Sequence, residues 1–161
     1  MATEKDITAA KIIYNGVKDT LDNMGWTYDE YESELKIVTG AGGKDISIDI
    51  GIYVDAEKHI VTVLSRLPID VPKDLRIDLS FAVSLINDHI VDGSFDYNVL
   101  DGSICFRTVV AYHDCSLSNE VFNYMIYITC RTVDDYNGML NKLSRSEITV
   151  SEFVDFISKD K

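Results

Sequence analysis

The chain has 161 residues, of which 46% are hydrophobic and 26% are charged. This length is typical of one domain, and the composition is typical of a globular protein with its own core. It excludes an intrinsically disordered chain and a collagen-like one. No apolar run approaches the ~20 residues of a membrane helix, and the amino terminus lacks the pattern of a secretory signal. We therefore expect a cytoplasmic protein without a membrane partner, folded as a single domain over residues 1–161.

The charge is strongly negative, because 27 acidic residues stand against 15 basic ones and give a formal net charge of −12. Binding to nucleic acid or to an anionic membrane surface requires clustered Lys and Arg, so neither is expected. The excess is concentrated in residues 74–135, which contain ten acidic residues, three arginines and no lysine. This stretch fits either general solubility or a surface suited to a basic partner.

The first 25 residues predict one helix. Thr3 and Asp6 form a capping pattern at its start, and Gly25 is suited to end it. Between them, apolar residues recur every three or four positions and define one helical face. The residues of this face are Ala10, Ile13, Val17, Leu21 and Met24.

Residues 35–66 predict three strands joined by short turns. Residues 35–39 form a short apolar run, and the glycine-rich stretch at 40–43 turns the chain. Residues 46–54 then alternate strictly, which is the period of a strand with one buried face and one wetter face. Residues 59–66 alternate again. The three strands predict an antiparallel meander.

A second helix is expected to follow, with an apolar face running from Leu75 to Ile90. Gly93 is suited to end it. Residues 94–100 and 103–112 predict two more strands, with a tight hairpin turn at Asp101-Gly102.

The last part of the chain predicts two helices. Ser116 or Ser118 caps a long third helix, and Thr149 with Glu152 forms a capping box that opens a short tail helix. The apolar face of the long helix consists of Val121, Met125, Ile128, Thr132, Tyr136, Leu140 and Leu143.

The resulting order, α-β-β-β-α-β-β-α with a further tail helix, favours an α+β fold. We expect a five-stranded, mainly antiparallel, twisted sheet with helices packed on it. Residues 3–147 form the core of the expected domain, and residues 148–161 form its tail.

A local pattern of five residues follows the second helix into the next two strands: Asn87, Gly93, Phe95, Gly102 and Arg107. Together with the order of elements, this pattern resembles the YbjN family, whose fold is similar to that of type III secretion chaperones. Ile86 and Asp88 depart from the pattern, because that family usually has a leucine and a basic residue there. The resemblance implies a protein-binding module without chemistry, commonly dimeric and often described as a regulator. It names no client.

The same residues have structural explanations of their own. Gly93 permits the positive φ that ends a helix, and Asn87 can hydrogen-bond the backbone at the corner between helix and strand. We expect Phe95 to pack under the second helix. Arg107 lies mid-strand among apolar neighbours, so it needs a carboxylate or carbonyl partner.

No motif predicts catalysis or cofactor binding. Residues 40–45 lack the first glycine and the hydroxyl residue of a phosphate-binding loop, and residues 92–103 lack the glycine and glutamate of a calcium loop. His113-Asp114-Cys115 has no second ligand cluster nearby in sequence, although His59 or His89 could reach it through folding, and it lacks an oxyanion donor for a nucleophile. The many carboxylates fit a solvated surface better than a glycosidase pair. We therefore expect no catalytic, cofactor-binding or metal-binding residue, and no enzyme.

Three of the nine tyrosines, Tyr53, Tyr124 and Tyr127, fall outside the predicted buried faces, and exposed aromatic residues among acidic ones suit a protein interface. The leading hypothesis is a non-enzymatic, chaperone-like or regulatory module that binds a protein or peptide client. It is expected to form a homodimer through a sheet face, a sheet edge or the third helix. The alternative is a small-ligand-binding or enzymatic domain with a cavity between sheet and helices, where Arg107 and His113 serve as polar groups.

Overall fold

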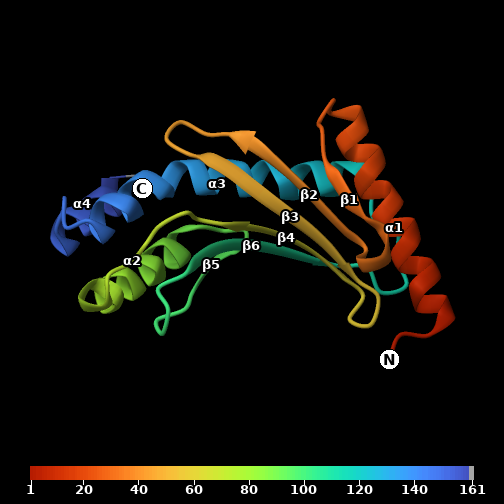
Figure 1. Ribbon diagram of the computed structural model, residues 1–161, viewed down its shortest axis with the longest axis horizontal. Helices are drawn as coiled ribbons and strands as arrows, with labels where there is room; N and C mark the ends of the chain where they lie inside the picture. Colours follow the sequence, from red (N-terminus) through yellow and green to blue (C-terminus); the bar gives the residue numbers. More distant parts are fainter. Residues whose placement is uncertain (160–161) are drawn as a thin grey trace.

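The computed structural model describes residues 1–159 and has an α+β architecture (Figure 1). Its helices are α1 (Glu4–Asn23), α2 (Arg76–His89), α3 (Asn119–Ser144) and α4 (Val150–Lys159). Its strands are β1 (Asp29–Tyr31), β2 (Lys36–Gly42), β3 (Ser47–Asp55), β4 (Ile60–Arg66), β5 (Ser94–Tyr97) and β6 (Ile104–Ala111). Short 3-10 helices, η1 (Glu32–Glu34) and η2 (Lys73–Leu75), precede β2 and α2. The last two residues of the expected tail, 160–161, lie outside the described part of the chain.

The strands form one open antiparallel sheet in the order β1-β2-β3-β4-β6-β5. The α+β prediction is confirmed, but the expected count of five strands was wrong, since residues 1–159 contain six. The additional strand is β1, which has three residues and pairs with β2 from Asp29–Val38 to Tyr31–Lys36. All three residues of β1 are exposed. Because neither face of β1 is buried, its sequence has no apolar alternation that could reveal a strand.

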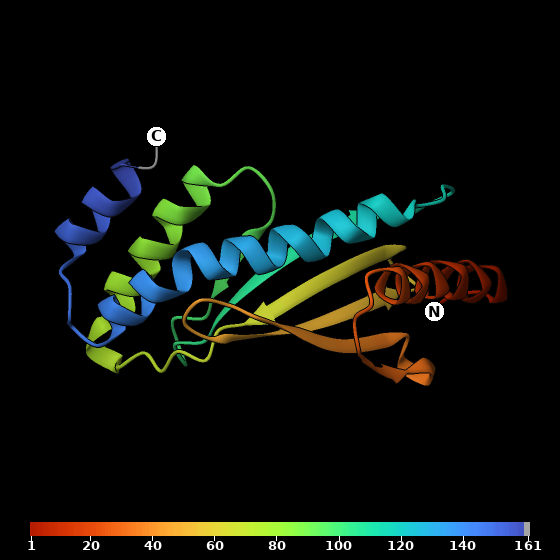
Figure 2. The same ribbon diagram turned by 90° about the horizontal axis from the view of Figure 1, so that it is seen from above.

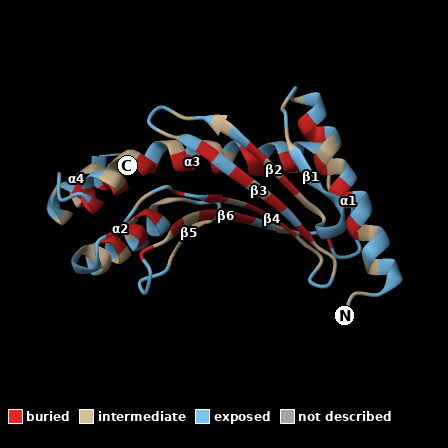
Figure 3. Cartoon of the chain, in the orientation of Figure 1, coloured by how far each residue is buried: buried red, intermediate tan, exposed pale blue. Residues whose placement is uncertain are grey.

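Helices cover one face of the sheet. Figure 2 shows α3 crossing this face, with α1 toward one end of the molecule and α2 and α4 toward the other, while no helix of residues 1–159 covers the opposite face. Strand residues on the covered face are buried and alternate with more exposed residues on the open face (Figure 3). The main apolar residues of the covered face are Ile37, Ile48, Ile50, Ile52, Val54, Val61, Val63, Phe95, Ile104 and Phe106. The alternation of apolar and polar residues predicted for 46–54 is therefore explained by the helices, which bury one face of the strand and leave the other in solvent.

Local capping interactions fix where α1 and α4 begin. At α1, the Thr3 hydroxyl accepts a hydrogen bond from Asp6 N (3.3 Å) and the Asp6 carboxylate accepts one from Thr3 N (2.8 Å). Thr149 and Glu152 make the same reciprocal pair at α4 (3.2 and 2.8 Å). Both predicted capping patterns are confirmed. Ser118, not Ser116, occupies the position before α3, but its side chain makes no capping hydrogen bond to the backbone of that helix.

The long helix α3 buries a wider face than the sequence predicted. Val121 and Ile128 are only half-buried, whereas Phe122, Ile126, Thr129 and Val133 are buried. The reason is that α3 packs against α1 as well as against β4 and β6. At the contact with α1, the Phe122 ring lies so close to Gly16 that a Cβ there would be 3.1 Å from Phe122 Cε2. A helix with neighbours on two sides cannot be described by one apolar stripe.

The connection between β5 and β6 also differs from the tight hairpin expected. β5 ends at Tyr97, and the loop runs from Asn98 to Ser103, closed by a hydrogen bond from Gly102 N to the Asn98 carbonyl oxygen (2.7 Å). Gly102 has a φ of 82°, which a glycine adopts at little cost. The Asp-Gly pair thus predicted the position of the turn correctly, but the loop is longer than the tight hairpin that was expected.

Candidate partner-binding surface

The corner between α2 and β5 is built by two residues of the sequence pattern. The Asn87 side chain donates a hydrogen bond from Nδ2 to the Phe95 carbonyl oxygen (2.9 Å) and accepts one at Oδ1 from Phe95 N (2.8 Å). Gly93 has a φ of 76°. A side chain at this position would also press against Phe106 and the Arg107 carbonyl oxygen. Both residues therefore shape the corner.

Phe95 belongs to the core of the molecule. It is 2% exposed, and its ring packs edge-on against Phe106 of β6 (5.0 Å between centroids) and Tyr136 of α3 (6.1 Å). Asn87 of α2 holds the Phe95 backbone, while α3 supplies the aromatic neighbour of its ring. These contacts hold β5 in the sheet beneath the helices.

Arg107 projects from the open face of the sheet and pairs with Asp96 of β5. Its Nε donates to Asp96 Oδ2 (2.6 Å) and its Nη2 donates to Asp96 Oδ1 (3.1 Å). These hydrogen bonds raise the pKa of the Arg107 guanidinium, which stays charged. Since the helices lie on the other face, Arg107 is not in a hollow between sheet and helices. His113 lies beyond the end of β6, with 69% of its side chain exposed. The cavity hypothesis placed these two residues together, and the structure does not.

Of the residues weighed as catalytic or metal-binding, His113 lies beside His59, which folding brings to it from the turn before β4. His113 Nε2 is 3.3 Å from Asp114 Oδ2, and its ring packs edge-on against His59 (4.7 Å between centroids). His59 in turn lies 2.9 Å from the Asp6 carboxylate. No group of three or more metal-ligating side chains occurs within residues 1–159. Cys115 is exposed and unpaired. Lys44, of the loop that superficially resembled a phosphate site, donates its backbone N–H to Asp134 of α3 (2.6 Å).

The open face of the sheet carries a row of side chains aligned across five strands. The register places Tyr31, Lys36, Tyr53, Thr62 and Val109 side by side, from β1 to β6. Tyr31, Tyr53 and Val109 are 44%, 39% and 46% exposed. The adjacent row contains Asp29, Val38, Gly51, Leu64, Arg107 and Ser94. This face therefore offers aromatic and aliphatic side chains to solvent, which is typical of surfaces that other molecules cover.

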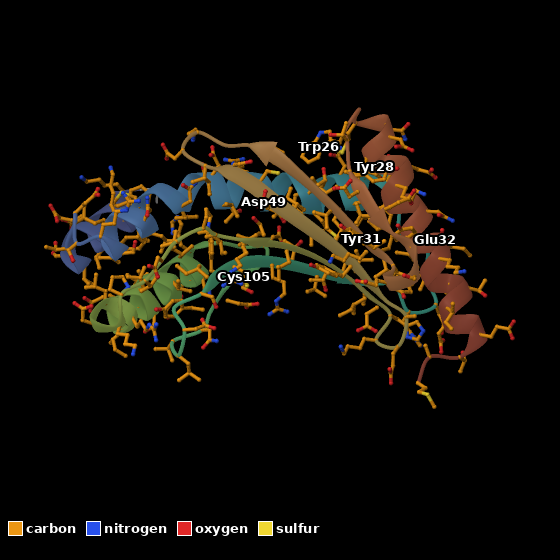
Figure 4. All side chains as sticks on the ribbon, viewed as in Figure 1. Trp26, Tyr28, Tyr31, Glu32, Asp49 and Cys105 are labelled. Atoms are coloured by element: carbon orange, nitrogen blue, oxygen red, sulfur yellow. The ribbon has the colours of Figure 1, made fainter. Side chains whose placement is uncertain are left out.

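A cation lies between two of these aromatic rings. Lys36 Nζ is 4.8 Å from the centroid of the Tyr31 ring and 5.9 Å from that of Tyr53. The Tyr53 ring extends over Gly51, where a Cβ atom would come within 2.7 Å of it. In Figure 4, Tyr31 and Glu32 are labelled toward the α1 end of the sheet, whereas Asp49 and Cys105 are labelled farther toward its middle. Sequence reasoning selected Tyr53 but missed Tyr31 and Lys36, because only the strand register brings the three together.

The other two tyrosines selected from the sequence are on a different surface. Tyr124 and Tyr127 project from α3 and are 48% and 53% exposed. The Tyr124 hydroxyl donates to Asp92, which raises the Tyr124 pKa, and the Tyr127 hydroxyl accepts a hydrogen bond from Arg131 (3.3 Å). Tyr124 also lines a shallow depression of about 280 Å³ together with Val91. The three tyrosines are exposed, but they do not form one site.

None of the helices in residues 1–159 has the length and apolarity that crossing a membrane requires. Within residues 1–159, the geometry thus defines an α+β protein with one layer of helices and an uncovered sheet face.

Comparison with solved structures identifies this fold as YbjN-like and type III secretion chaperone-like, as the resemblance implied. The structure of YbjN from E. coli superimposes with a TM-score of 0.57 and 10% identity over 83% of this chain and 92% of that one. The ExsC–ExsE complex gives a TM-score of 0.59 and 10% identity over 81% and 95% of the two chains. The HopA1–SchA chaperone–effector complex gives 0.50 and 9% over 84% and 97%. No known protein family and no curated protein matches the amino-acid sequence.

Proposed function

We propose that this protein is a non-enzymatic, chaperone-like or regulatory module that binds a protein or peptide client. Two of the solved structures that share its fold are complexes with a second protein, and one of them is a chaperone with its effector. This supports a binding role for the fold. The similarity in fold does not identify the client of this chain or the pathway in which it acts. We also propose that the protein is cytoplasmic.

The observation that carries the proposal is the open sheet face. Tyr31, Tyr53 and Val109 stand in one row with about two-fifths of each side chain in water. An antiparallel sheet with one solvated face normally places polar residues there. Burying the aromatic and β-branched side chains at these positions is favourable by roughly 25 cal/mol of free energy per Å² of apolar surface removed from water. A client segment lying on the face supplies that burial.

The experiment that tests this function is capture of partners from the native cytosol by the intact chain, with mass spectrometry and a mass measurement of the complex. Tyr53→Lys combined with Val109→Lys places two positive charges on the open face, and Tyr124→Lys combined with Tyr127→Lys places the same charge on α3 as a control. We expect the wild type and the control to retain the same protein in defined stoichiometry, and the open-face variant to lose it. Equal capture by all three proteins, or no stoichiometric partner at all, contradicts the proposal.

We also propose a homodimer, and the exposed apolar residues of α2 favour that helix as its contact surface. Ile77 and Phe81 are 69% and 48% exposed and lie one helical turn apart. Leu100, in the β5–β6 loop, is 84% exposed, and Arg76 of α2 donates hydrogen bonds to the carbonyl oxygens of Leu100 and Asp101. These contacts hold the loop beside α2 and extend its apolar surface. The surface expected from the sequence was a sheet face, a sheet edge or α3, and α2 was not among them.

A further inference from the structure

The position of Lys36 indicates what kind of group the two tyrosines accept. The face of an aromatic ring attracts a cation within about 6 Å of its centroid. Lys36 Nζ satisfies this for both Tyr31 and Tyr53. No carboxylate of residues 1–159 pairs with Lys36, so the rings are its principal partners in the described chain. A long, flexible side chain held only by two half-exposed rings can be displaced by another cation.

Two unpaired carboxylates lie on the same sheet face, in the two rows that follow the row of Lys36. Asp29 and Asp49 lie on the open face, opposite Val38 and Gly40 of β2 respectively. Neither makes a hydrogen bond or ion pair within residues 1–159. Glu30 provides the contrast, since it lies on the other face of β1 and binds Lys18 at 2.6 Å, which lowers the Glu30 pKa. The carboxylate on one face of β1, that of Glu30, is thus paired with a lysine, whereas Asp29 and Asp49 on the open face of the sheet have no cationic partner.

The surface between these groups suits an extended chain. Val38 and Leu64 are half-buried neighbours of Gly51 on the open face, and Gly40 carries no side chain there. Glycine in a strand marks a place where another backbone can approach closely. Every second side chain of an extended segment points to the same side. Such a segment can place cationic and aliphatic side chains on this surface together.

We propose that the surface formed by Asp29, Tyr31, Lys36, Asp49 and Tyr53, here called the aromatic–acidic surface, binds an extended basic segment of a partner protein. A Lys or Arg side chain of that segment takes the place of Lys36 between the two rings, while the free carboxylates attract its neighbours. The inference rests on the proposed function, because it names the chemistry of the client.

Fluorescence anisotropy with a synthetic probe tests the inference. The probe is a labelled peptide of about ten residues, the length of a long strand, that alternates Thr with Lys or Val. A second peptide carries Glu in place of Lys. We expect saturable binding of the basic peptide that weakens as salt is added, and no binding of the acidic one. Equal binding of the two peptides, or no binding of the basic one, overturns the inference.

Two pairs of variants separate the cation site from general electrostatics. Tyr31→Leu with Tyr53→Leu keeps apolar area but removes the ring faces, and we expect affinity for the basic peptide to fall at least about five-fold. Tyr127→Leu serves as control. Lys36→Met vacates the rings and should tighten binding by about two- to five-fold. Lys73→Met makes the same change in net charge on η2. If Lys73→Met tightens binding as much as Lys36→Met, or if the double leucine variant binds unchanged, the inference is wrong.

The capture experiment distinguishes this inference from the function on which it rests. A natural partner that is retained by the wild type and equally by the Tyr31→Leu, Tyr53→Leu variant leaves the proposed function standing and overturns the aromatic–acidic surface. A partner lost by that variant but retained by Tyr127→Leu supports both. If the wild type retains no stoichiometric partner, the proposed function fails and the inference fails with it.

Discussion

The side chain of Asn87 occupies the place that another strand would take beside β5. Its carboxamide accepts a hydrogen bond from Phe95 N and donates one to the Phe95 carbonyl oxygen, as a neighbouring backbone would. An unpaired edge is a template for strand addition. Asn87 therefore occupies the backbone hydrogen-bonding groups in the middle of the β5 edge. At the other edge of the sheet, no described side chain binds the outer backbone groups of β1 in this way. A client that adds a strand has access at the β1 edge.

Replacing Asn87 with alanine should destabilise the protein by about 1–3 kcal/mol, because it leaves two part-buried backbone groups without partners. Urea unfolding measures the loss. Asn23→Ala, at the exposed end of α1, is the control and should change stability by less than about 0.5 kcal/mol. Hydrogen exchange at the Phe95 amide should accelerate in Asn87→Ala alone. Unchanged protection of that amide would show that Asn87 is not its partner.

Gly93 and Gly25 allow backbone conformation and packing to be separated. Their φ angles are similar, 76° and 69°, so alanine should cost about 1–2 kcal/mol at either position. A Cβ at Gly25 meets no atom within 4 Å, whereas at Gly93 it meets Phe106, the Arg107 carbonyl oxygen and Thr108. We expect Gly93→Ala to lower the free energy of unfolding by at least about 2 kcal/mol more than Gly25→Ala. Equal losses in denaturant titrations contradict the packing argument.

Sequence could locate these residues because each meets a local requirement. A glycine that ends a helix and an asparagine at the following corner follow from backbone geometry over a few positions. Tyr31 and Lys36 were missed for the opposite reason. They are neighbours of Tyr53 through the register of β1, β2 and β3, a relation between strands rather than within one.

At the scale of elements, prediction succeeded where one face of an element is buried and the other is not. β3 alternates over its whole length, since buried residues from Ile48 to Val54 point at the helices. β1 was missed because it is exposed on both faces, and the face of α3 was predicted too narrowly because α1 packs on it as well. The spacing of apolar residues shows which face of an element is packed against the rest of the protein. It therefore misleads when no face is packed, as in β1, or when two faces are packed, as in α3.

The start of α1 is joined to the turn between β3 and β4 by a contact that depends on pH. The Asp6 carboxylate binds Thr3 and lies 2.9 Å from His59 Nε2. These hydrogen bonds, those from Thr3 foremost, hold the Asp6 pKa at about 2, below its usual 3.8. A carboxyl whose pKa is depressed in the folded state stabilises it above the unfolded pKa. This contribution is lost as the pH falls from about 4 to about 2.

Asp6→Asn should therefore flatten the loss of thermal stability in that range. Other carboxylates with lowered pKa values, including Glu30 and Glu152, keep their share, so the slope of Tm against pH should diminish and not vanish. Asp78→Asn, in the first turn of α2 where no side-chain capping bond is made, should keep the wild-type slope. Melting curves recorded from pH 2 to 5 decide the matter, and parallel profiles for Asp6→Asn and wild type refute the assignment.

On the scale of the whole molecule, the described chain presents two separate surfaces that lack a partner. The open sheet face carries Tyr31, Tyr53 and Val109, and the outer side of α2 carries Ile77 and Phe81. In Figure 1, α2 lies toward the end of the molecule away from β1 and α1. A homodimer formed through α2 thus leaves the aromatic–acidic surface of each copy free. Dimerisation and client binding do not compete in this arrangement.

The dimer surface can be tested with two isoleucines of nearly equal exposure. Ile77 of α2 is 69% exposed and Ile12 of α1 is 67% exposed. A charge on either is tolerated by the monomer, but at an interface that buries about 800 Å² per partner it adds a desolvated carboxylate. Sedimentation of the wild type should give twice the 18.1 kDa chain mass, and so should Ile12→Asp, whereas Ile77→Asp should sediment as a monomer. If the wild type sediments as a monomer, the proposed homodimer is wrong. If Ile77→Asp still sediments as a dimer, the dimer contact does not lie on α2. Because the proposed client site is the open face, Ile77→Asp should still retain the client, with one client per chain. This single substitution would then separate the dimer surface from the client surface.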